Sequence, residues 1–82
     1  MEVNEHRKEQ RQRTFKGGTI SFDRAAGIDC LVRNISKTGA CLEIDTTVGI
    51  PEKFTLVIKP EYLKRNCQVV WRTAQKVGVH FV

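Results

Sequence analysis

The chain has 82 residues, of which 40% are hydrophobic and 28% charged, so we expect one small globular domain. No apolar run approaches the roughly 20 residues that cross a bilayer, and no apolar segment follows the charged N-terminus as in a secretion signal. The formal net charge of +5 favours anionic partners, and we expect a cytoplasmic protein without a membrane span.

The first 13 residues are predicted to form a flexible basic arm. They carry no hydrophobic periodicity, and Arg7, Lys8, Arg11 and Arg13 outweigh the glutamates among them. A run of charges of this kind is usually solvated, so the arm by itself implies no particular partner. Residues 14–82 are predicted to form the folded domain.

Six short segments of alternating apolar and polar residues follow the arm. They cover residues 19–22, 28–33, 40–45, 54–59, 67–72 and 77–82, and clusters of turn-forming residues separate them. Half-buried antiparallel strands require this alternation. Outside these segments, residues 60–64 have room for a single helical turn. Six strands with one apolar face each cover those faces most economically in a closed barrel. The predicted fold is therefore all-β, a six-stranded antiparallel β-barrel.

The three cysteines indicate neither disulfides nor a metal site. Cys30, Cys41 and Cys67 are odd in number and widely spaced, without a C-x-x-C pair. Cys30 and Cys67 are in phase with apolar neighbours, which predicts core positions for both. His6 and His80 lie far from the cysteines in the sequence, so we expect no bound metal and no cofactor.

Two separated motifs point to a function. The arm contains R-x-x-x-R, from Arg7 to Arg11, and a later segment contains [D/N]-x-S-x-x-G, formed by Asn34, Ser36 and Gly39. Either motif alone is weak, because Asn, Ser and Gly are the commonest turn formers and spaced arginines occur in any basic segment. Together they resemble the paired signature of the PilZ domain family. The Val-Val-Trp-Arg and Val-Gly-Val-His-Phe segments near the C-terminus resemble that family's closing hairpin, so the resemblance covers nearly the whole chain.

The resemblance implies a receptor for the bacterial second messenger cyclic di-GMP that regulates a partner protein and is not an enzyme. Arg7 and Arg11 are then expected to contact guanine and phosphate, because the arginine fork matches guanine O6 and N7. The family's pattern places Asn34, Ser36 and Gly39 on the barrel side of the site, with Gly39 in a positive-φ turn. Candidate auxiliary contacts are Lys8, Arg13, Trp71 and Arg72.

The roles of individual residues have simpler alternatives. Asn34 and Ser36 would serve a turn equally well through hydrogen bonds from side chain to backbone. Trp71 is in phase with Cys67 and Val69, so we expect it in the core or as a plug at the barrel rim rather than as a stacking platform.

Two other functions compete with nucleotide binding. One is a PilZ-like adaptor that works through protein contacts alone. The other is a barrel that binds single-stranded nucleic acid, which is disfavoured because Phe22, Phe54 and Phe81 fall on the inward phase and leave few aromatics to stack on bases. No catalytic constellation appears in the sequence. The target protein and the oligomeric state stay open. The number of bound ligand molecules stays open too, because in the PilZ family it depends on the residue before the arginine motif, and here that residue is His6.

Overall fold

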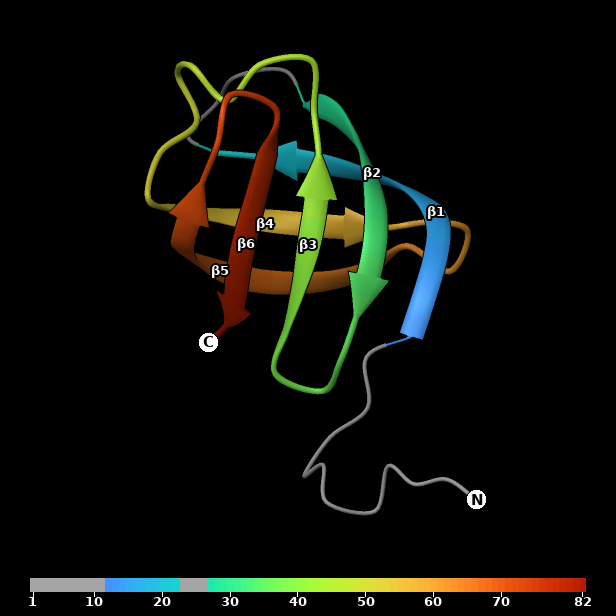
Figure 1. The fold of residues 1–82 in the computed structure, drawn as a ribbon. Helices are drawn as coiled ribbons and strands as arrows, with labels where there is room; N and C mark the ends of the chain where they lie inside the picture. The colour runs from blue at the N-terminus through green and yellow to red at the C-terminus, as the bar shows by residue number, and fades with distance from the viewer. Residues whose placement is uncertain (1–11, 23–26) are drawn as a thin grey trace, which may run out of the picture.

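Six antiparallel strands form a closed barrel in the computed structural model, which describes residues 12–22 and 27–82 (Figure 1). The strands are β1 (Gln12–Ser21), β2 (Ile28–Ile35), β3 (Gly39–Glu43), β4 (Lys53–Ile58), β5 (Leu63–Arg72) and β6 (Lys76–Phe81). They are hydrogen-bonded in the order β1-β2-β3-β6-β5-β4, and β4 closes the barrel onto β1. The predicted all-β, six-stranded antiparallel barrel is confirmed.

The strands lie in two directions around the core. In Figure 1, β2, β3 and β6 cross β4 and β5, while the long, curved β1 pairs with both β2 and β4. The described part of the chain contains no helix that is long and apolar enough to span a membrane.

Most of the core is built from residues that alternate along the strands, as the sequence predicts, and Ile44 and Ile50 join it from the segment between β3 and β4. Along β4, Phe54, Leu56 and Ile58 are buried, and the residues between them are more exposed. The other buried hydrophobic residues are Ile20, Val32, Leu42, Ile44, Ile50, Cys67, Val69, Val77 and Val79. Removing one aliphatic side chain of this size from water contributes about 1.5–3 kcal/mol. The shared inner face therefore holds the six strands together.

Two strands, β1 and β5, begin several residues earlier than the segments that the sequence predicts. β1 begins at Gln12, two residues before the predicted start of the folded domain. β5 begins at Leu63, and residues 63–66 are exposed while they pair with β4. A strand segment with no buried face shows no alternation, so the pattern could not find it. Residues 60–64, which have room for a helical turn, do not form one: Tyr62 has a φ of 60°, which a right-handed helix does not admit.

A β-bulge in β5 exchanges the expected positions of Trp71 and Arg72. Val69 pairs with Val79 and Trp71 pairs with Gly78, so Val70 is the extra residue. Val70 and Trp71 are 65% and 46% exposed, and the prediction that Trp71 lies in the core or plugs the rim is wrong. Arg72 pairs with Val77 and therefore takes the phase of the strand on which the sequence placed Trp71.

Arg72 fastens the segment between β3 and β4 to the end of β5. Its Nη1 donates to the carbonyl oxygens of Thr47 and Ile50 at 3.2 and 2.8 Å, and its Nη2 donates to the Glu52 carboxylate at 3.1 Å. These hydrogen bonds hold the guanidinium against the β3–β4 segment, which explains why the side chain is half-buried.

Replacing Arg72 with alanine is predicted to lower the free energy of unfolding by about 2–3 kcal/mol, because two carbonyls lose a charged donor. The matched control is Glu52→Gln, which removes only an exposed ion pair and should cost about 0.5 kcal/mol or less. Urea denaturation of both variants measures the difference. Equal losses would contradict the anchoring role of the two carbonyl bonds.

Candidate functional site

A continuous row of cross-strand pairs crosses five strands of the barrel wall. It joins, in order, Arg13 of β1, Asn34 of β2, Cys41 of β3, Gly78 of β6 and Trp71 of β5. Register shifts interrupt β1, β2 and β5 beside this row. Bulges often redirect side chains next to binding sites, so this part of the wall is the candidate site.

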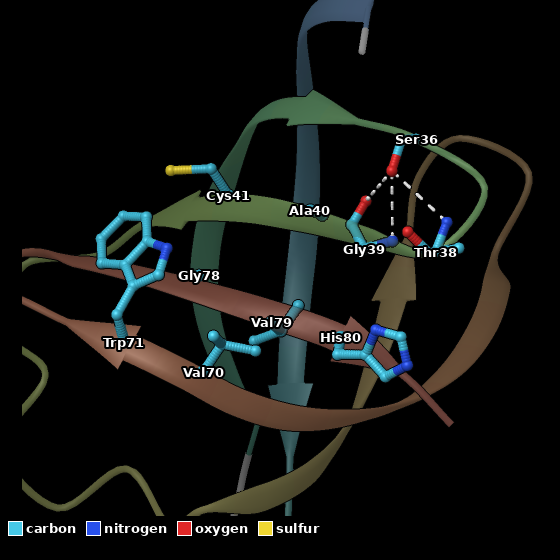
Figure 2. Close-up of a pocket in the computed structure, with 10 residues that line it drawn as sticks. All are labelled: Ser36, Thr38, Gly39, Ala40, Cys41, Val70, Trp71, Gly78, Val79 and His80. Carbon is cyan, nitrogen blue, oxygen red and sulfur yellow. Dashed lines mark hydrogen bonds between the residues drawn. The ribbon is translucent and has the colours of Figure 1, made fainter. Parts of the chain in front are cut away.

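A pocket of about 550 Å³ lies along this row, between the β2–β3 turn and the bulge of β5 (Figure 2). Its lining residues are Ser36, Thr38, Gly39, Ala40, Cys41, Val70, Trp71, Gly78, Val79 and His80. The volume is within the range of about 300–1,000 Å³ that is usual for small-molecule sites. None of these lining residues is acidic, and Lys37 belongs to the same turn. The pocket therefore presents no carboxylate that would repel an anion.

Ser36 organises the turn at one end of the pocket. Its Oγ accepts hydrogen bonds from the backbone N–H groups of Thr38 and Gly39, both at 3.3 Å, and donates to the Gly39 carbonyl at 3.4 Å (Figure 2). The Ser36 N–H also donates to the Gly39 carbonyl at 2.8 Å. Ser36 thus stabilises the turn through hydrogen bonds from its side chain to the backbone, which is the alternative role considered for it. The hydroxyl's own donated bond is longer than the usual O–H···O distance of about 2.5–3.0 Å, so its proton is only weakly engaged.

Gly39 is required by a close approach of two strands. A Cβ at this position would lie 2.2 Å from the Val79 carbonyl oxygen of β6. The predicted positive φ is wrong: among the glycines that the structure describes, Gly49 alone has one, at 88°. The tight contact between β3 and β6 therefore explains the glycine, and the turn geometry does not.

Trp71 lies directly against Gly78 on the outer face of β6. A Cβ at Gly78 would meet the indole Nε1 at 2.2 Å and Cε2 at 2.3 Å. The absence of a side chain at Gly78 thus lets the indole pack onto the strand and form one wall of the pocket (Figure 2). An indole held in this way, with about half of its surface exposed, offers an apolar surface on which a planar ring can stack.

Asn34 belongs to a separate, smaller pocket of about 200 Å³, together with Phe15, Arg33 and Lys76. The Arg33 guanidinium lies 5.5 Å from the Phe15 ring centroid and pairs with Glu43. Of the three barrel-side residues of the motif, Ser36 and Gly39 therefore line the larger pocket, and Asn34 lines the smaller one. Cys41 lines both pockets and lies between them.

The residues of the first motif lie outside the described part of the chain. This applies to Arg7, Lys8 and Arg11, so their contacts stay a prediction. Arg13 lies in β1 and pairs with Asn34, which puts the point where the predicted arm joins the barrel at one end of the row.

Sequence reasoning missed several lining residues, namely Cys41, Val70, Gly78 and His80. A glycine inside a strand was a usable indication of close packing at Gly78. Nothing in the sequence indicated His80, because only strand register brings it opposite Gly39. Of the auxiliary candidates on β5, Trp71 lines the pocket, whereas Arg72 is held by the β3–β4 segment.

The three thiols differ in their surroundings. Burial raises the pKa of Cys30 to about 12, with the Asp29 charge adding to the shift, and burial raises the pKa of Cys67 to about 11. Both thiols stay protonated at neutral pH and react slowly. Cys41 instead lines two open pockets. Across residues 12–22 and 27–82, no three His, Cys, Asp or Glu residues form a group that could hold a metal ion.

Cys41 is therefore predicted to be alkylated first when the folded protein is treated with iodoacetamide near neutral pH. Peptide mass spectrometry at increasing reaction times measures the order of modification. Cys41→Ser supplies the matched control, which should remove the fast phase. Modification of Cys30 or Cys67 at the rate of Cys41 would contradict the predicted difference.

Comparison with known proteins adds a finding on the family. The model of the PilZ domain matches residues 5–82, a span that includes both sequence motifs and all six strands. None of the curated proteins compared with the chain matches it.

Proposed function

The chain belongs to the PilZ domain family, and from that premise we propose that it is a receptor for cyclic di-GMP. PilZ domains form a family of cyclic di-GMP receptors, which act as ligand-binding adaptors rather than enzymes. The observation that carries the proposal is the pocket between the Ser36 turn and Trp71, which combines polar groups, a stacking surface and a lining without carboxylates.

The chemistry of the ligand matches these groups. Cyclic di-GMP has two guanines and two phosphates, so a site needs flat apolar contacts, hydrogen-bond donors and positive charge. Trp71 supplies a face for one guanine, and Ser36 supplies a hydroxyl for a phosphate or base oxygen. Arg7 and Arg11 supply the charge and the fork that fits the guanine edge. Arg11 lies two residues before Arg13, which pairs with Asn34 of the second motif.

Signalling follows from a ligand that joins two parts of the chain. A nucleotide held by Arg7 and Arg11 on one side and by the Ser36 turn on the other would order the arm across the barrel. The surface offered to a regulated partner protein then changes. Our proposal includes a cytoplasmic location, which is typical of PilZ proteins, and no cofactor other than the ligand.

A titration with cyclic di-GMP tests the proposal, and Trp71 provides an internal probe because it is the single tryptophan of the chain. We expect saturable heat in calorimetry, which also gives the stoichiometry, and a change of tryptophan fluorescence with the same midpoint. Cyclic di-AMP is the matched control ligand, since adenine lacks the O6 acceptor that arginine recognises on guanine. Absence of binding, or equal binding of both dinucleotides, would refute the proposal.

A nucleotide-free adaptor is the second candidate, favoured by one observation. Val70 and Trp71 expose 65% and 46% of their surface next to each other on the β5 bulge, as a protein-contact surface would. This function would be supported if cyclic di-GMP did not bind. Binding of a single-stranded oligonucleotide that weakens steeply with salt would instead support the nucleic-acid alternative.

A further inference from the structure

His80 lies on the outer face of β6, where it borders the same pocket as the Ser36 turn (Figure 2). It is paired with Gly39 of β3 on one side and with Gln68 of β5 on the other. Its side chain is exposed, and Gly39 has no side chain to cover it. The imidazole therefore borders the open pocket.

The charged groups on the elements around His80 are mostly basic. Lys37 belongs to the turn, Lys53 follows Gln68 in the same cross-strand row, and Arg65 lies over the neighbouring Phe81 ring at 5.5 Å. Among the described residues of β3, β5 and β6, the one acidic side chain is that of Glu43. Glu43 lies four positions from Gly39 along β3, and its carboxylate forms an ion pair with Arg33.

One further titratable group on these elements, the Cys41 thiol, lines the same pocket, and it is not a fixed anionic partner. No side-chain carboxylate among the described residues is thus paired with His80. A phosphate of the ligand can therefore be the anion that contacts a protonated imidazole in this pocket.

The spacing along β6 fits a nucleotide. Trp71 packs against Gly78, and His80 follows Gly78 by two residues on the same face, a distance of about 7 Å along a strand. A purine stacked on Trp71 would hold the phosphate attached to its ribose near His80 and the Ser36 turn. Building on the proposed function, we propose that protonated His80 contacts a phosphate of bound cyclic di-GMP, so that binding is coupled to proton uptake.

The direction of the coupling follows from this contact. A phosphate beside His80 favours the imidazolium, so the complex binds a proton more readily than the free protein does. Affinity for the ligand then rises as the pH falls through the range of about 5 to 8 in which histidine titrates. The phosphodiesters and guanines of the ligand keep a constant charge over most of that range. Between pH 7.5 and 5.5 the gain should approach about tenfold, as expected for one charge-assisted contact.

The test is a calorimetric titration of the full chain with cyclic di-GMP at about pH 5.5, 6.5 and 7.5. The natural chain should bind more tightly at each step down in pH. His80→Gln should bind at the weak level at every pH, and His80→Lys should bind at the strong level at every pH, because its charge is permanent. The matched control is His6→Gln, since His6 is the other histidine of the chain, and this variant should keep the pH dependence.

A second readout separates a proton-linked contact from a structural one. Titrations at about pH 6.5 in buffers of different ionisation enthalpy should show proton uptake that disappears in His80→Gln and persists in His6→Gln. A pH dependence that survives in His80→Gln would overturn the inference and leave cyclic di-GMP binding intact. Binding without pH dependence would overturn it as well. Absence of binding by the natural chain at every pH would refute the proposed function, and this inference with it.

Discussion

Replacing Arg7 or Arg11 with alanine is expected to weaken cyclic di-GMP binding about ten- to a hundredfold, the cost of one charge-assisted contact of about 1.5–3 kcal/mol. Arg7→Lys and Arg11→Lys should recover only part of the loss, because an ammonium carries the charge without the planar fork. Calorimetric titration measures the affinities. The melting temperature should stay nearly unchanged, because both residues precede the first strand at Gln12.

The matched control for the arginines is Lys64→Ala. Lys64 is an exposed residue of β5 that does not line the pocket, and its loss changes the net charge equally. This variant should bind almost as the natural chain does. Asn34→Ala and Ser36→Ala should have intermediate effects, since neutral hydrogen bonds contribute less than charged ones. Full affinity in both arginine variants would remove Arg7 and Arg11 from the site.

Replacing Gly39 with alanine is expected to lower the free energy of unfolding by about 2–3 kcal/mol, the upper part of the range of about 1–3 kcal/mol that is typical of overpacking. The new Cβ would lie 2.2 Å from the Val79 carbonyl oxygen, so the backbones of β3 and β6 would have to separate. Gly39→Val should be more destabilising, because two further methyl groups enter the same space. Urea denaturation measures both losses.

Two other glycines serve as controls for this prediction. A Cβ at Gly17 would meet only the flexible Lys59 side chain, at 4.0 Å, so Gly17→Ala should be close to neutral. Gly49 has open space around it but a φ of 88°, so Gly49→Ala should lose about 1–2 kcal/mol from backbone strain alone. A Gly39→Ala variant as stable as Gly17→Ala would show that the β3–β6 approach is not tight.

The barrel and most of its core could be predicted from the sequence. Alternation is a local property, and in β4 it continues without interruption, so Phe54, Leu56 and Ile58 were assigned correctly to the core. The family was also visible, because the two motifs have fixed spacing within short segments. The family model, which matches residues 5–82, agrees with that resemblance.

The site was less predictable, because it depends on how the strands are paired. One extra residue in β5 moved Trp71 to the outside and Arg72 to the opposite phase, and a bulge has no marker in a run such as Val-Val-Trp-Arg. The need for Gly39 arises from its distance to β6, forty residues later in the chain. His80 enters the pocket through the same pairing. The amino-acid pattern determined which strand faces are apolar, and therefore the fold. Which polar and aromatic side chains meet was decided only by the register between strands that are distant in the sequence. That register depends on tertiary contacts, which a local pattern does not contain.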